Sequence, residues 1–211
     1  MLSNENPWSN IPLKDYEAHM AHPLVGQSEM LSRLMESALI KYKPVSLAIL
    51  GIAGGNGLEH VHTTQTTHVY GVDISQVYLN ECQNRYSSQI ENLILIKHDL
   101  NSREVLPFKV NLILAGLIFE YIELENGLNQ VDSCLYQSGS LIVTLQKNNG
   151  VTSVSNSGIN SIKQVAGIFN LVDEGTFEKN ILALGYIKTE RSESFLPNGK
   201  SFVSLEFKKL I

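Results

Sequence analysis

The sequence lacks the residues that mark several common protein classes. It contains only two cysteines among 211 residues, Cys82 and Cys134, and they form no CxxC or Cys/His spacing. We therefore expect two reduced thiols, with neither a disulfide framework nor a metal site. Lys and Arg number 16 against 21 Asp and Glu, and they form no basic stripe. That deficit argues against nucleic acid as the main partner, since binding phosphates requires concentrated positive charge.

Long apolar runs are also missing. No stretch approaches the roughly 20 residues that span a bilayer, so we expect no membrane partner. Residues 1–10 are polar and lack a basic flank followed by an apolar run, which predicts no signal peptide and a cytoplasmic location. The hydrophobic content of 43% and the charged content of 18% are typical of a globular domain. The length is enough for one domain with a sizeable core, and no feature indicates an oligomeric state.

What is present is an alternation of strand and helix patterns. Short apolar runs predict strands at 45–50, 68–73, 93–98, 110–115 and 140–145. Helical spacing predicts helices at 13–20, from about 25 to 43, 56–65, after Ser75, 123–137, 161–169 and 176–184. A polar loop at 148–160 and a hairpin of 186–195 with 201–209, turning at Pro197-Asn198-Gly199, complete the chain. This order predicts an α/β fold with a mainly parallel sheet, helices on both faces and an antiparallel edge.

The first predicted strand enters a glycine-rich loop. Four glycines fall within the seven residues from Gly51 to Gly57. Glycine allows positive φ and a close approach of ligand to backbone. In open α/β sheets ligands bind beyond the carboxyl ends of strands, which is where this loop is predicted to lie.

Two acidic positions follow at the ends of the next two predicted strands. Asp73 stands 22 residues after Gly51, a spacing at which a carboxylate can accept hydrogen bonds from ribose hydroxyls. At the end of the third strand, Asp99 can accept a bond from an adenine amino group while Leu100 packs against the ring. Each feature alone is also compatible with an ordinary turn or helix cap, so the inference rests on their order at three successive strand ends.

These residues together resemble the class I S-adenosylmethionine-dependent methyltransferases over about 45–209. The resemblance implies a Rossmann-like sheet of seven strands, six parallel and one antiparallel, ending in a β-hairpin. It also implies S-adenosylmethionine as the cofactor and a domain at 45–211, with the helical segment 1–44 as its lid. The cofactor-binding residues it implies are Gly51, Ile52, Ala53, Gly55, Asn56, Asp73, Ile74, Asp99, Leu100, Ala115, Gly116 and Gln27.

Two positions depart from the family pattern. The acid often found two residues before the first glycine is Ile49 here, and the middle glycine is Ala53. They leave open a rival interpretation, a regulatory module that binds the nucleoside cofactor without transferring methyl. A nicotinamide-dependent oxidoreductase is a further alternative, but a GxGxxG motif beginning at Gly51 would need glycines where Ala53 and Asn56 stand.

The acceptor is expected to be a small molecule. The Asn/Asp-Pro-Pro-aromatic motif of enzymes that methylate adenine or glutamine is absent after Ala115, where Gly116 to Tyr121 is mostly apolar. Tyr16 and His19 share a helical face in the N-terminal segment, so we predict that they line the pocket, with His19 as a catalytic base. The alternative is that both are surface or packing groups.

Overall fold

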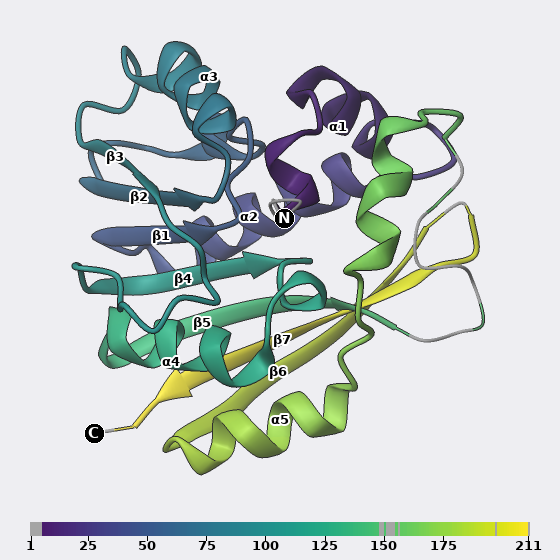
Figure 1. Cartoon of the computed structure of the whole chain (residues 1–211). Helices are drawn as coiled ribbons and strands as arrows, with labels where there is room; N and C mark the ends of the chain where they lie inside the picture. The colour runs from purple at the N-terminus through teal and green to yellow at the C-terminus, as the bar shows by residue number, and fades with distance from the viewer. Residues whose placement is uncertain (1–5, 148–149, 151–154, 156, 197, 211) are drawn as a thin grey trace.

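The strands of the chain form one mixed sheet in the computed structural model, which describes residues 6–147, 150, 155, 157–196 and 198–210. Within these residues the sheet has seven strands in the order β3-β2-β1-β4-β5-β7-β6 (Figure 1). The strands are β1 (Ser46–Leu50), β2 (His68–Asp73), β3 (Leu93–Lys97), β4 (Val110–Gly116), β5 (Leu135–Gln146), β6 (Tyr186–Phe195) and β7 (Ser201–Lys209).

Strand direction follows the prediction. β1 pairs in parallel with β2 and β4, β2 with β3, and β4 with β5, whereas β7 runs antiparallel to both β5 and β6. The sheet therefore has six parallel strands and one antiparallel strand among the described residues, and the predicted fold class is confirmed. In the register, Leu50 faces Val72 on one side and Ala115 on the other, so the carboxyl ends of these three strands meet at one edge.

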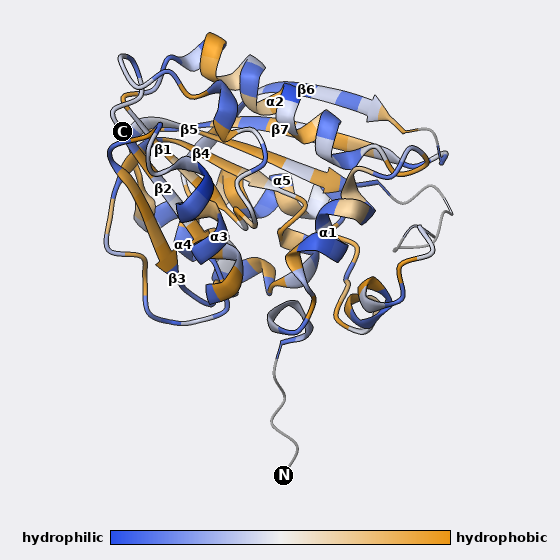
Figure 2. Ribbon diagram, turned by 90° about the horizontal axis from the view of Figure 1, so that it is seen from above, coloured by the Kyte–Doolittle hydropathy of each residue, from blue (hydrophilic) through white to orange (hydrophobic). Residues whose placement is uncertain are grey.

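Helices cover both faces of this sheet. On one face, α2 (Gln27–Tyr42) and α3 (Gln76–Tyr86) bury side chains that include Met35 and Leu79. On the other, α4 (Leu124–Cys134) and α5 (Glu174–Ala183) bury residues such as Val131 and Phe177. The strands between these layers carry most of the strongly apolar residues (Figure 2). The described residues also include α1 (Leu13–Met20) and the 3₁₀ segments η1 (Pro7–Ser9), η2 (Leu58–His60), η3 (Phe119–Tyr121) and η4 (Ser161–Gly167).

Local capping explains where helices begin and end. The Ser75 hydroxyl accepts a bond from the Tyr78 N–H, which starts α3 at the predicted position. Asp173 caps α5 in the same way, at 2.8 Å from the Thr176 nitrogen. Gly185 follows α5 with a φ of +86°, in the left-handed region that commonly ends a helix.

The helix predicted at 56–65 is wrong. The structure places only the short η2 segment there, followed by turns back to β2. The physical reason lies in the residues after Val61, which are a polar run with four threonines and a single glutamine before His68. β-Branched threonines disfavour helix, and this run offers no apolar face to bury.

Two other predicted helices are corrected. The segment at 161–169 is a 3₁₀ helix, η4, rather than an α-helix. The helix predicted at 123–137 ends at Cys134, and the next three residues belong to β5, which bends into the sheet through a positive φ at Ser138. Within the polar loop predicted at 148–160, only 150, 155 and 157–160 are described. Pro197 of the predicted hairpin turn also lies outside the described residues.

The N-terminal segment is fastened across the glycine loop to α3. Arg85 on α3 donates two hydrogen bonds to the Glu17 carboxylate on α1, at 2.5 and 3.2 Å. The Tyr78 hydroxyl donates to the Ile11 carbonyl at 2.8 Å and is itself buried. α1 thus lies over the carboxyl edge of the sheet beside η4 (Figure 1). The proposed division into a lid at 1–44 and a domain at 45–211 stays a prediction.

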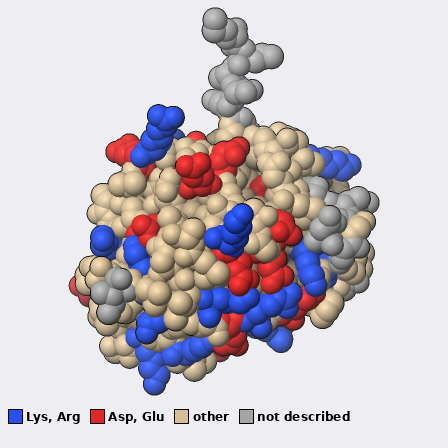
Figure 3. All heavy atoms as spheres, turned by 90° about the horizontal axis from the view of Figure 1, so that it is seen from below, with Lys and Arg blue, Asp and Glu red and all other residues tan. Residues whose placement is uncertain are grey.

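The surface carries charges of both signs. On the face shown in Figure 3, basic side chains gather mainly over the lower half, with acidic side chains among and above them. Surface ion pairs, such as Arg191 with Glu174 at 2.6 Å, join charges of opposite sign. Among the described residues, no helix combines the length and apolar character needed to cross a membrane.

Candidate active site

The glycine loop leaves β1 at the carboxyl edge of the sheet and is fixed by backbone bonds to β2. The Gly51 and Ile52 amides both donate to the Val72 carbonyl, at 2.9 and 3.1 Å. Gly55 has a φ of +92°, and a Cβ there would lie 2.7 Å from the Tyr86 ring. Only glycine therefore meets both demands at that position, because a left-handed backbone and a close neighbour coincide.

Ala53 adopts the left-handed conformation without being glycine. Its φ is +48°, and its side chain is buried against Leu13 of α1 and Tyr78 of α3. An L-residue in this region costs roughly 1 kcal/mol. The packing of the methyl group beneath α1 offsets part of that cost.

Asp73 ties the loop to the end of β2. Its Oδ2 accepts a bond from the Ala53 amide at 2.9 Å, and its Oδ1 accepts from the Ser75 amide at 2.8 Å. Burial raises the pKa of the Asp73 carboxyl, and the backbone donors oppose that rise. Each carboxylate oxygen has a second lone pair, so the group can still accept hydrogen bonds from a ligand.

A cavity opens at this edge, between the strand ends, α1 and η4. It brings together most of the residues predicted from the sequence. The predicted residues that line it are Tyr16, His19, Gln27, Gly51, Ala53, Asp73, Ile74, Asp99, Leu100 and Gly116.

Four predicted residues do not line this cavity. Ile52 packs in the core beneath α2 and α3, and Gly55 faces the α3 side chains. Asn56 donates to the Ser28 carbonyl of α2 at 3.0 Å. Ala115 is buried in the sheet. Three of them, Ile52, Asn56 and Ala115, border a second hollow on the α2 side of the loop.

His98 contributes an unpartnered atom to the cavity. Its Nε2 is buried and has no hydrogen-bond partner among the described residues. Its backbone amide donates to the Asp73 carbonyl at 3.0 Å, which aligns the ends of β2 and β3. A buried polar atom without a partner is costly and indicates a place that a ligand can satisfy. The sequence signal was available, since His98 directly precedes the predicted Asp99.

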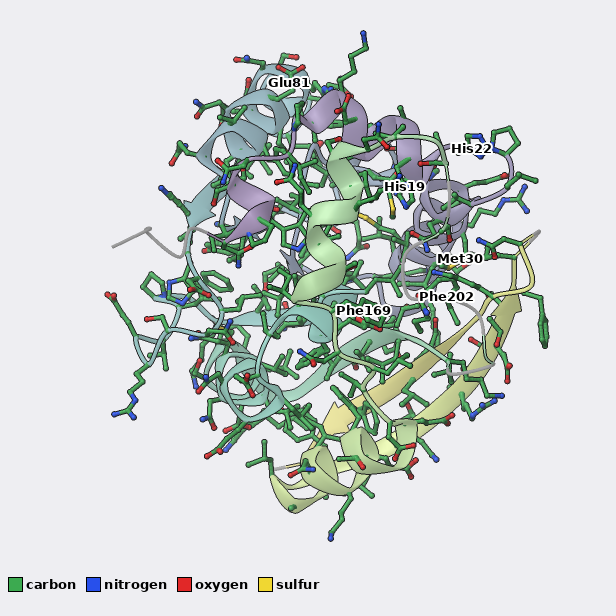
Figure 4. The ribbon with its side chains drawn as sticks, turned by 45° about the vertical axis from the view of Figure 1, so that its right-hand side comes forward. His19, His22, Met30, Glu81, Phe169 and Phe202 are labelled. Carbon is green, nitrogen blue, oxygen red and sulfur yellow. The ribbon has the colours of Figure 1, made fainter. Side chains whose placement is uncertain are left out.

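Aromatic rings form the outer wall. Trp8 lies edge-to-face on Tyr121 and on Tyr16, with centroids 5.0 and 5.7 Å apart, and Tyr121 meets Phe169 at 5.6 Å. Figure 4 shows Phe169 at one end of η4 and His19 of α1 beside the same segment. Burial raises the pKa of Tyr16, so its hydroxyl stays protonated at neutral pH.

His19 is held as a neutral imidazole. Its Nδ1 lies 2.7 Å from the Ser157 hydroxyl, and only 6% of the residue is exposed. Burial, with the nearby positive charge of Lys200, lowers the pKa of His19 to about 4. Such a weakly basic imidazole is poorly matched to proton abstraction near pH 7.

The cavity wall also carries a polar cluster of Glu120, Gln146 and Lys200, of which the sequence indicated only Glu120, in the segment after the fourth strand. Glu120 Oε1 accepts from the Gln146 amide at 2.6 Å, and the Lys200 ammonium donates to the Gln146 side-chain oxygen at 3.1 Å. Glu120 and Lys200 are each 1% exposed. Burial raises the pKa of Glu120 to about 7 and lowers that of Lys200 to about 8. Nothing in the sequence marked Lys200, because a lysine after Asn-Gly is typical of an exposed turn.

No group of three or more His, Cys, Asp or Glu side chains within the described part of the chain has a metal-binding arrangement. The residues that line the cavity offer hydrogen bonds, charge and apolar walls. Those groups suit an organic ligand with both polar and flat parts.

Comparison with known proteins supports the fold. No family model matches the sequence, and no curated protein matches it. Among solved structures, magnesium protoporphyrin IX methyltransferase from Synechocystis PCC 6803, crystallised with S-adenosylhomocysteine (SAH), is similar with a TM-score of 0.67 at 14% identity, covering 93% of each chain. The N-methyltransferase NodS from Bradyrhizobium japonicum WM9, also with SAH, has a TM-score of 0.65 at 12% identity over 99% of this chain and 94% of that one.

The chain has the fold of the class I S-adenosylmethionine-dependent methyltransferases. A [4+2]-cyclase, SpnF, is similar as well, with a TM-score of 0.66 at 12% identity over 86% of this chain and 81% of that one. A fold shared at such identities establishes architecture and leaves the reaction to be argued from the site. In this methyltransferase fold, the glycine loop, Asp73 and His98 lie at the carboxyl ends of β1, β2 and β3, beside one cavity.

Proposed function

We propose that the chain is an S-adenosylmethionine-dependent methyltransferase that acts on a small molecule. The observation that carries the proposal is the cavity at the carboxyl ends of β1, β2 and β3. There the loop, the Asp73 carboxylate and the His98 Nε2, which has no partner in the described part of the chain, face one space. Carboxylate and imidazole acceptors beside a glycine loop suit a nucleoside, and the methyltransferase neighbours above were crystallised with SAH.

The residues present fit this cofactor in named roles. Asp73 would accept hydrogen bonds from ribose hydroxyls, and Asp99 with Leu100 would contact the adenine, with His98 beside them. Gly51, Gly116 and Gln27 would surround the methionine end. S-adenosylmethionine, when bound, supplies an electrophilic methyl group on a sulfonium. The chain contributes orientation and exclusion of water, and a well-oriented acceptor can lower the barrier by roughly 7–11 kcal/mol.

Incubating the protein with methyl-labelled S-adenosylmethionine and a metabolite extract tests the proposal. We expect label in at least one small molecule, together with release of SAH. Heat-denatured protein is the control for non-enzymatic transfer. Binding of SAH without any transfer of label would instead support the second candidate.

The second candidate is a module that binds the cofactor without methyl transfer. One observation favours it: a solved structure with the same fold is named for a reaction other than methyl transfer, so the fold alone does not imply that reaction. Ile49 and Ala53, the two departures from the family pattern, are consistent with it. Both candidates predict SAH binding, so only the fate of the label separates them.

A further inference from the structure

One carboxylate oxygen of Glu120, a residue of the cavity wall, lacks a hydrogen-bond donor within the described part of the chain. Its Oε1 is engaged by the Gln146 amide, but its Oε2 is buried and has no hydrogen-bond partner among the described residues. Glu120 follows β4, at the strand end beside the glycine loop, and lines the cavity. A buried carboxylate oxygen without a donor is costly, so this site is built to receive one.

The surroundings of that oxygen suit a cation. Tyr121, Trp8 and Phe169 form an aromatic wall on the same cavity, and aromatic faces attract ammonium groups. Among the described lining residues, the acidic side chains are Asp73, Asp99 and Glu120, whereas Lys200 is the one Lys or Arg. An excess of negative charge remains even beside a positively charged sulfonium cofactor, which favours a positively charged acceptor over an anionic one.

We propose that the acceptor is a small amine, and that Glu120 Oε2 binds its ammonium form and removes its proton. This inference rests on the proposed methyltransferase function. Oε2 takes one proton from the ammonium, giving a neutral amine and a carboxylic acid. The nitrogen lone pair then forms the new bond to the methyl carbon while the carbon–sulfur bond breaks, and its electron pair stays on sulfur. The products are an N-methylammonium and a thioether.

The neighbouring groups support this assignment of the base. Lys200 reaches the same Gln146 residue, and its positive charge favours the Glu120 carboxylate while disfavouring the ammonium form of a bound amine. A pKa near neutrality suits a base better than that of His19, which is lowered to about 4. Tyr16 and Tyr121 keep their protons, since burial raises the pKa of both.

Matched amine and alcohol probes test the proposal without a known substrate. Protein saturated with SAH is titrated by calorimetry with tryptamine and phenethylamine, and with the corresponding alcohols tryptophol and 2-phenylethanol. We expect at least one amine to bind about tenfold or more tightly than its alcohol, because a buried carboxylate gains a charged hydrogen bond. Glu120→Gln keeps the acceptor for the Gln146 amide and should abolish this preference. The matched control Glu125→Gln, on the exposed face of α4, should retain it.

The same pairs are then supplied with S-adenosylmethionine. We expect N-methylated product and a fall in kcat of about 10²–10⁴-fold in Glu120→Gln, the usual range for losing a general base. Binding that is equal for amines and alcohols, methylation of the alcohols alone, or an amine preference that survives Glu120→Gln would overturn the amine assignment and leave the methyltransferase proposal standing. The assignment also falls if SAH binds but no amine does. Absence of SAH binding would instead contradict the methyltransferase proposal itself.

Discussion

The Asp73 carboxylate and the Ala53 backbone amide are joined by a hydrogen bond of 2.9 Å. This bond links the end of β2 to the one non-glycine residue of the loop that has a positive φ. Because the second carboxylate oxygen holds the Ser75 amide, Asp73 fixes both the loop and the start of α3. The group expected to bind ribose is thus also the group that shapes the site.

Asp73→Ala should weaken SAH binding by about 1–3 kcal/mol, through loss of charge-assisted hydrogen bonds. Calorimetry on wild type and variant measures the difference, and circular dichroism checks that the variant is folded. Glu91→Ala, at an exposed position, is the control and should bind as wild type does. Unchanged affinity in Asp73→Ala would show that the ribose-binding role belongs elsewhere.

Gly55→Ala should destabilise the protein more than Gly185→Ala. Both glycines have similar φ values, +92° and +86°, so the backbone strain is comparable. Only at Gly55 would the new Cβ meet neighbours, at 2.7 Å from Tyr86 and 2.9 Å from Leu58. We expect an extra loss of about 1–3 kcal/mol from overpacking, measured by urea denaturation. Equal losses would mean that the loop relaxes freely.

Glu120→Gln should change how stability depends on pH. The folded pKa of Glu120, about 7, lies above its ordinary value of 4.5, so the fold favours the protonated form. Its stabilising contribution is therefore full below pH 4.5 and is lost as pH rises through 7. We expect the variant to be more stable than wild type at pH 8 by about 1–3 kcal/mol, and the difference to vanish toward pH 4. Denaturation curves that show no such trend would indicate an ordinary pKa.

His19 should titrate far below the usual range. Its pKa of about 4 predicts that the ring proton signals in NMR spectra stay constant from pH 8 down to about 5. Because the folded pKa is depressed, His19 contributes stability that is present above pH 6.5 and is lost as pH falls through 4. A midpoint above 6 would restore His19 as the expected base.

Most of the sheet was predictable because its strands are short apolar runs bounded by turn residues. The loop, Asp73 and Asp99 were found for the same reason, since strand ends fix their position along the chain. The prediction of a helix at 56–65 was wrong, because the threonine-rich polar residues after Val61 form turns when they have no apolar face to bury.

The acceptor side of the cavity was harder to foresee. Lys200 and Gln146 come together only through the pairing of β5 with β7. The sequence indicated Glu120 in the segment after the fourth strand. Its burial, and the lack of a donor for its Oε2 among the described residues, depend on contacts that no spacing encodes. The low pKa of His19 likewise comes from the burial of its ring, which lies against Ser157, a residue distant in the sequence.

Calorimetric titration of the whole protein with SAH tests the central claim most directly, with NAD as the comparison ligand. The account predicts a saturable heat with SAH at micromolar concentrations and none with NAD. No detectable heat with SAH at high micromolar ligand would contradict it, and so would saturable binding of NAD in its place.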